Sequence, residues 1–202
     1  MTRRVQSTAP DPPHIRRMSG YRLQIMVQSV EFLLDEVSEQ RIRRQWELLA
    51  EAGLPGLGRG ARAGDTESHR PHITVAVARQ IWPRIEKDLD GLPFRPFPIR
   101  LGGVLVFGAR RPILVRAVVP SEQLLAWHRR VHQIVAPCPD VPANLHPGQW
   151  TPHITLARRV LPPRLGEAVT AVAADKDMTA TVVGLRRWDG DHRRAWPIAE
   201  HG

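Results

Sequence analysis

Cysteine, lysine and long apolar runs are scarce in this chain of 202 residues. Its single cysteine, Cys138, excludes an internal disulfide and a cysteine-based metal cluster. The longest apolar stretch, 101–109, is far shorter than the roughly 20 residues that a membrane-spanning helix requires. The first twenty residues are polar and lack the apolar segment of a secretory signal. These absences predict a soluble protein of the cytoplasm.

Lysine is largely replaced by arginine, because the chain has 29 basic residues and only Lys87 and Lys176 are lysines. The net charge is +9 and the isoelectric point is about 11.3. A guanidinium group matches the oxygens of a phosphate, so the composition permits an RNA or nucleotide partner. An ordinary basic surface explains the same charge equally well, and the charge alone therefore assigns no function.

Hydrophobic periodicity divides the chain into alternating strands and helices. Residues 1–20 are expected to form a flexible tail, and glycine and proline predict a long mobile loop at 53–64. Alternating patterns predict strands at 21–30, 70–78, 97–107, 112–119, 151–157, 179–187 and 194–199. Helical spacing predicts helices at 31–50, 82–89, 121–136 and 163–174.

The same order of elements, strand, helix, strand, helix and strand, occurs twice. The two units cover about 21–107 and 112–188 within one domain, 21–199. This order predicts an α+β, bilobal fold with two pseudo-symmetric lobes. Each lobe is expected to have a mostly antiparallel sheet with helices on its outer face, and the active-site cleft is expected between the lobes.

The second strand of each unit contains nearly the same six residues, 71–76 (PHITVA) and 152–157 (PHITLA). Nine histidines and fifteen serines and threonines would give a His-x-Thr spacing less than once by chance. Because side chains alternate along a strand, His72 and Thr74 share one face, as do His153 and Thr155. If the two lobes face each other, these four side chains converge on one cleft.

Two imidazoles and two hydroxyls suit the cleavage of a phosphodiester without a metal or another cofactor. One imidazole can take a proton from the attacking water while the other protonates the leaving oxygen. The hydroxyls of the threonines can donate to the non-bridging oxygens, where negative charge is held. Spacing alone does not say which histidine has which role.

The paired motifs, with Arg158 completing the second as HITLAR, resemble the 2H phosphoesterase superfamily and its 2′-5′ RNA ligase-like (LigT-like) branch. The resemblance covers about 21–199. It implies an RNA 2′,3′-cyclic phosphodiesterase that produces 2′-phosphates, with 2′-5′ ligation as the reverse reaction in some members. It also implies that His72 is the proton donor and His153 the proton acceptor.

The same resemblance implies that Thr74 and Thr155 hold phosphate oxygens and that Arg158 contacts phosphate or ribose. The chain departs from the branch in its 53–64 loop, its tail and its high arginine content, which leaves the substrate open. Alternative functions are hydrolysis of another cyclic phosphate, such as that of ADP-ribose, and binding of nucleotide or RNA without catalysis. A monomer is expected.

The other chemically active side chains have plainer interpretations. His128 and His132 are four positions apart on a helix, yet no acid or cysteine lies nearby, so both are expected on its solvent face. Cys138 is expected to be an unreactive loop residue. Trp150 and Phe107 could stack on a base, but packing is the favoured role for both. The Arg110–Arg111 turn is expected to be solvated.

Overall fold

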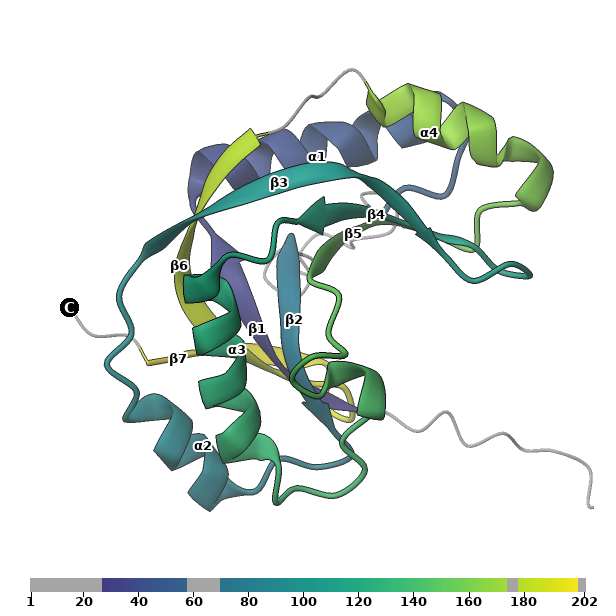
Figure 1. The fold of residues 1–202 in the computed structure, drawn as a ribbon. Coiled ribbons are helices and arrows are strands. Elements are labelled where there is room, and N and C mark those ends of the chain that lie inside the picture. The colour runs from purple at the N-terminus through teal and green to yellow at the C-terminus, as the bar shows by residue number, and fades with distance from the viewer. Residues whose placement is uncertain (1–26, 58–69, 174–177, 200–202) are drawn as a thin grey trace, which may run out of the picture.

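The computed structural model describes residues 27–57, 70–173 and 178–199 (Figure 1). Its strands are β1 (Gln28–Leu34), β2 (His72–Ala78), β3 (Phe97–Phe107), β4 (Ile113–Val118), β5 (His153–Arg158), β6 (Met178–Asp189) and β7 (Arg194–Ile198). Its helices are α1 (Glu36–Glu51), α2 (Pro83–Asp90), α3 (Glu122–Val135) and α4 (Leu165–Ala173), with short 3-10 turns at Ala143–Leu145 and Pro162–Arg164. The predicted α+β class is confirmed.

All seven strands belong to one antiparallel sheet, in the order β1-β2-β5-β4-β3-β6-β7. A further pairing joins β1 to β6, so six of the strands form a closed circuit of pairs, and β7 extends it from β6. The strands are long and strongly bent, as Figure 1 shows for β3 and β6. Along its length β3 pairs with two strands, β6 and β4, and β6 pairs with three, β3, β1 and β7.

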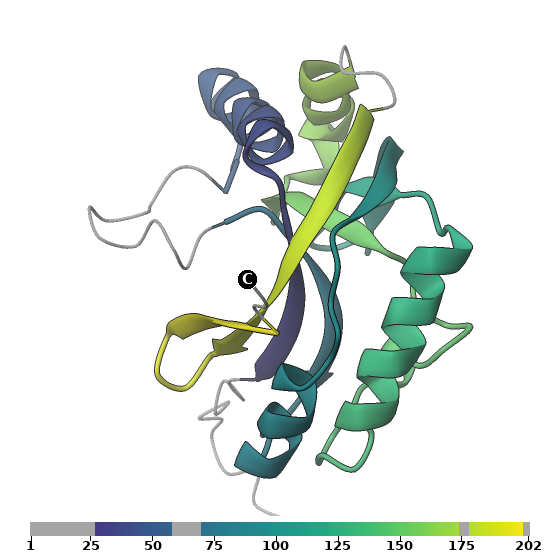
Figure 2. The ribbon, with the colours of Figure 1, turned by 90° about the vertical axis from the view of Figure 1, so that its left-hand side faces the viewer.

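The two sequence units exchange their third strands. The third strand of the first unit, β3, pairs with β4, the first strand of the second unit. The third strand of the second unit, β6, pairs with β1, the first strand of the first unit. The helices follow the same rule, since α1 lies beside α4 and α2 beside α3 (Figures 1 and 2). Each unit thus depends on the other for its packing, while the division into two lobes stays a prediction.

The largest departure from the predicted elements concerns residues 31–34, which were expected in the first helix but continue β1. Phe32 and Leu34 are fully buried, and the alternation of a strand explains this pattern as well as a helix does. Asp35 sets the boundary, because its carboxylate accepts hydrogen bonds from the backbone N–H and the hydroxyl of Ser38. An aspartate that caps the first turn in this way starts the helix at Glu36.

The other boundaries lie close to the predicted ones. Ser121 caps α3 as expected, and Pro83 is the first residue of α2. The tail at 1–20, the beginning of the first expected strand at 21–26 and most of the 53–64 loop lie outside the described residues. No helix in the described part of the chain is long and apolar enough to cross a membrane.

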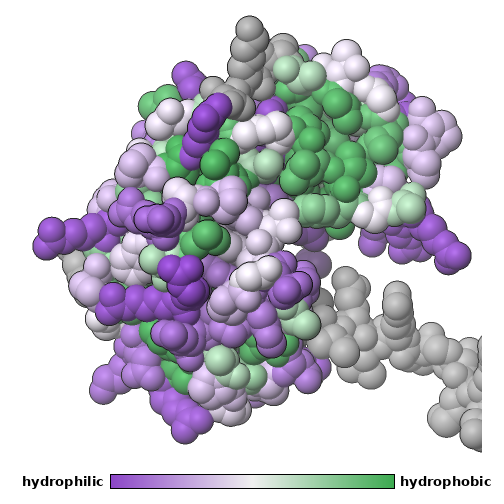
Figure 3. All heavy atoms as spheres, viewed as in Figure 1, coloured by the Kyte–Doolittle hydropathy of each residue, from purple (hydrophilic) through white to green (hydrophobic). Residues whose placement is uncertain are grey.

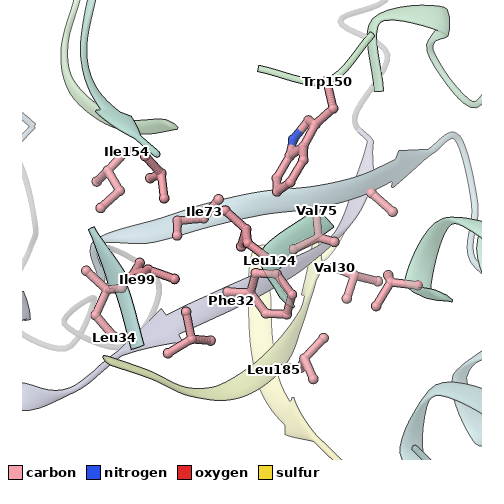
Figure 4. Packing of buried hydrophobic residues seen from close by; sticks show 14 of the residues in the cluster. Val30, Phe32, Leu34, Ile73, Val75, Ile99, Leu124, Trp150, Ile154 and Leu185 are labelled. Atoms are coloured by element: carbon pink, nitrogen blue, oxygen red, sulfur yellow. The ribbon is translucent and has the colours of Figure 1, made fainter. Parts of the chain in front are cut away.

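One continuous hydrophobic core lies behind the face of the sheet that carries the paired motifs. It is formed by alternate residues of several strands (Figure 4), and α3 packs against β2. Ile73 and Ile154, the central residues of the two motifs, point into this core and are almost completely buried. On the molecular surface in Figure 3, hydrophobic residues gather near α4, whereas the opposite end around α2 is mainly hydrophilic.

Candidate active site

The two motif strands, β2 and β5, are direct neighbours in the sheet. They run antiparallel, and Ile73 pairs with Ile154. This register sets His72 opposite Thr155 and His153 opposite Thr74 on the same face of the sheet. All four side chains are partly exposed, whereas the isoleucines between them are buried. The sheet therefore brings together, on one surface, the four residues that the repeated motif singled out.

Both motif strands contain a β-bulge at the same place, directly after the threonine. On β2 the partners of β1 skip Val75, and on β5 the partners of β4 skip Leu156. A bulge adds an unpaired residue and increases the local bend of a strand. The repeat in sequence is thus also a repeat in backbone geometry, and the bend separates the motif from the continuation of each strand.

Two tryptophans bind the backbone of the motifs at these bulges. The indole N–H of Trp150 donates to the carbonyl oxygen of Thr74 at 3.1 Å. The indole N–H of Trp46, on α1, donates to the carbonyl oxygen of Thr155 at 3.0 Å. Because a bulge interrupts the ladder of backbone hydrogen bonds, a side-chain donor there satisfies a carbonyl group and fixes its position. No local pattern predicts this pairing, since the two indoles come from different parts of the chain.

The two histidine rings are held in the same way. The Nδ1 atom of His72 lies 2.7 Å from the carbonyl oxygen of Arg70, and Nδ1 of His153 lies 2.7 Å from the carbonyl oxygen of Thr151. A carbonyl group only accepts, so Nδ1 carries the hydrogen in both rings. Nε2 of each ring is then the atom that can accept or give a proton during a reaction.

A pocket of about 450 Å³ lies over the motifs. Four of the five predicted site residues line it: His72, Thr74, Thr155 and Arg158. His153 is not part of this lining; its ring stands edge-on to Phe107, with 4.9 Å between the ring centres. Burial lowers the pKa of His153, and the charges of His72 and Arg158 add to this effect, although the hydrogen bond to Thr151 acts in the opposite direction. A neutral imidazole at this position suits a proton acceptor.

A buried ion pair next to His72 was missed in the sequence. Glu31 on β1 pairs with Arg186 on β6 at 2.7 Å, and both side chains are almost completely buried. The hydroxyl of Ser29 donates to Glu31 at 2.7 Å, and Nε2 of His72 lies 3.5 Å from the same carboxylate oxygen. The assignment of residue 31 to a helix hid Glu31, although an acidic residue inside an apolar strand is a recognisable signal.

The solvent-face assignment of His128 and His132 was wrong. Both rings are buried, and His128 stacks on the ring of Trp150 with 4.0 Å between their centres. Nε2 of His128 lies 2.9 Å from the carbonyl oxygen of Leu145, to which it donates. The predicted inner face of α3 rests on its apolar residues alone, and such a pattern does not detect histidines that take the place of apolar residues on that face.

Trp150, Cys138 and the Arg110–Arg111 turn lie in the surroundings that the sequence predicted for them. Trp150 is nearly buried, stacks on His128 and donates to the backbone of Thr74. Cys138 is a buried free thiol in a loop. Arg110 and Arg111 are exposed on the turn between β3 and β4. Within the described residues, no group of three histidine, cysteine, aspartate or glutamate side chains could hold a metal ion.

Comparison with protein-family models matches residues 38–194 to the 2′-5′ RNA ligase superfamily. Among solved structures, Usb1 of Kluyveromyces marxianus is similar, with a TM-score of 0.51 and 17% sequence identity over 85% of this chain and 97% of that chain. A structure of the same yeast protein with uridine monophosphate gives a TM-score of 0.51 and 16% identity over 86% and 98% of the two chains. The search of curated proteins finds no match. At this identity the solved structures support the fold alone.

Proposed function

Since the chain belongs to the 2′-5′ RNA ligase superfamily, we propose that it is a phosphodiesterase for the 2′,3′-cyclic phosphate ends of RNA or of nucleotides. The product is a 2′-phosphate, and when the 5′ hydroxyl of another RNA replaces water as the nucleophile, the same opening of the cyclic phosphate forms a 2′-5′ bond and a free 3′ hydroxyl. Catalysis uses two histidines and needs no metal. One observation carries the proposal: two identical His-x-Thr motifs lie side by side on antiparallel strands, and each ring has its Nδ1 atom bound to the backbone.

In the proposed reaction, Nε2 of His153 takes a proton from a water molecule whose oxygen attacks phosphorus. The bond between phosphorus and the 3′ oxygen breaks, and Nε2 of His72 gives its proton to that oxygen. Thr74, Thr155 and Arg158 donate hydrogen bonds to the non-bridging oxygens, where charge builds up. The products are a 2′-phosphomonoester and a free 3′ hydroxyl, and the two histidines have exchanged their protonation states.

A nucleotide substrate is supported by the uridine monophosphate in the similar yeast structure, which has the same overall fold. It is also supported by the pocket, where Trp188 and Trp46 add aromatic surface beside the motif residues. Aromatic rings and arginine next to a phosphate site are common in proteins that bind single-stranded nucleic acids.

The test is hydrolysis of uridine 2′,3′-cyclic phosphate and of an oligonucleotide with the same end, in the presence of EDTA. We expect activity in the wild-type protein and a loss of roughly 100-fold or more in both His72→Ala and His153→Ala. His192→Ala is the matched control, because the side chain of His192 is 75% exposed on the turn between β6 and β7.

Full activity in either motif variant would refute the mechanism. Hydrolysis of an ADP-ribose cyclic phosphate in preference to both RNA substrates would assign a different substrate to the same chemistry. Tight binding of nucleoside monophosphates without turnover of any cyclic substrate would instead indicate a binding protein.

A further inference from the structure

The two halves of the site have the same backbone pairing but different neighbours. Thr74 of the first motif pairs with Glu31 on β1, and Thr155 of the second motif pairs with Val115 on β4. Both pairings directly precede the bulge that follows the threonine. Glu31 and Val115 therefore occupy equivalent positions in the two halves.

The equivalence extends one strand further. Glu31 pairs with Arg186 on β6, and Val115 pairs with Leu105 on β3. The first half thus has a carboxylate and a guanidinium group where the second half has two hydrophobic side chains. The two halves therefore have nearly the same backbone but different charges on the strands next to their histidines.

The carboxylate of Glu31 is held in one position. Arg186 donates from Nε to one of its oxygens at 2.7 Å, and the hydroxyl of Ser29 donates to the other at 2.7 Å. Burial alone would raise the pKa of Glu31, but the positive charges of His72 and Arg186, together with the hydrogen bonds from Ser29 and Arg186, hold it below its ordinary value. Glu31 is therefore ionised at neutral pH.

We propose that Glu31 is a positioning residue that keeps His72 protonated as the proton donor, and that the hydrophobic residues at the equivalent positions leave His153 neutral as the proton acceptor. This inference rests on the proposed function and adds the reason why two equivalent rings have different roles. The relevant contact is the 3.5 Å between Nε2 of His72 and the carboxylate of Glu31. At such a distance an ionised carboxylate favours the charged imidazolium.

Other charged groups also lie near His72, and they increase the expected effect of Glu31 on its protonation. Nη2 of Arg186 lies 3.3 Å from Nδ1 of His72, where its positive charge disfavours the imidazolium, and Glu31 compensates this charge. His153, on β5, is a further titratable group that faces the site of His72. Arg70, whose carbonyl oxygen binds His72, is itself paired with Glu39 on α1 at 2.8 Å. Removing the charge of Glu31 therefore removes its attraction for the imidazolium of His72 and leaves the repulsion between Arg186 and His72 uncompensated.

The test is the pH dependence of kcat/KM for a cyclic phosphate substrate, measured in the wild-type protein and in Glu31→Gln. The descending limb of the profile reports loss of the proton donor. In Glu31→Gln we expect this limb to move by about one pH unit or more to lower pH, which is about a tenfold loss of rate above the limb, while the ascending limb stays in place. Glu122→Gln is the matched control, because it removes the same charge at an exposed position on α3 that does not line the pocket.

A second measurement requires neither activity nor a variant at residue 31. In the wild-type protein, ring signals followed by NMR as a function of pH should show that His153 loses its proton at lower pH than His72. An unchanged descending limb in a folded Glu31→Gln protein, or the reverse order of proton loss, would overturn the inference. A wild-type protein without activity on cyclic phosphates would refute the proposed function, and the same ring signals, compared between the wild-type protein and a folded Glu31→Gln protein, would still decide the role of Glu31.

Discussion

The buried ring of His128 predicts that the protein loses stability in mild acid. Burial lowers the pKa of His128 to about 4, with smaller contributions from the charges of His132 and Arg129 and an opposing one from the hydrogen bond to Leu145. In the unfolded chain the ring has its ordinary pKa near 6.5. Below pH 6.5 the unfolded chain therefore binds a proton that the folded protein does not, and the free energy of unfolding falls.

The size of the effect follows from this difference. A fall in pKa from 6.5 to about 4 corresponds to about 3 kcal/mol once the pH is below both values. Between pH 7 and pH 5 the unfolded chain becomes protonated at this position while the folded protein remains neutral, which costs about 2 kcal/mol. For a domain with a free energy of unfolding of about 5–15 kcal/mol, this is a large loss.

Urea unfolding, followed by far-UV circular dichroism at pH 7 and pH 5, measures the loss. His128→Gln is the control, since its side-chain amide can donate to the carbonyl oxygen of Leu145 and can lie flat against Trp150 but does not titrate in this range. We expect the wild-type protein to lose about 2 kcal/mol more than the variant over these two pH units. Equal losses in the two proteins would show that His128 is not neutral in the folded state or is not buried.

Two further predictions concern the motifs. Trp150→Phe removes the donor to the carbonyl oxygen of Thr74. It should lower the free energy of unfolding by about 1–3 kcal/mol more than the control Trp127→Phe, because the indole of Trp127 makes no hydrogen bond to the described residues. A similar loss in both variants would mean that the hydrogen bond to Thr74 contributes nothing to stability. Arg158→Gln should lower kcat/KM for the cyclic phosphate about tenfold, because it removes a donor to the oxygens where charge builds up. Arg159→Gln, whose side chain does not line the pocket, should leave kcat/KM unchanged.

The motif strands could be predicted from the sequence because their signal is local and occurs twice. Alternation over six residues determines which side chains share a face, and the repeat indicates which faces belong together. Their direct adjacency is different, since Ile73 and Ile154 are far apart in the chain and no local pattern specifies that they pair. The repeat predicted only that the two faces converge on one cleft, and the pairing of the two strands within one sheet was not predicted.

The missed residues all act through partners that are distant in the sequence. Glu31 is buried because Arg186, 155 residues later, neutralises it, and Trp46 donates to a carbonyl group 109 residues away. The boundary before Glu36 was misplaced for a different reason. Apolar residues at 32 and 34 fit both a strand and a helix, and the cap formed by Asp35 is the decisive feature.

The closed circuit of strands has a consequence for the synthesis of the protein. A ribosome makes β1 among the first strands and β6 near the end, yet β6 is the strand that completes the ring against β1 and β3. While the chain is being made, β1 therefore has one edge without its final neighbour, and the charge of Glu31 has no guanidinium group to meet. Exposed edges of this kind invite association with other chains, so the growing polypeptide is expected to need protection until its last strands emerge.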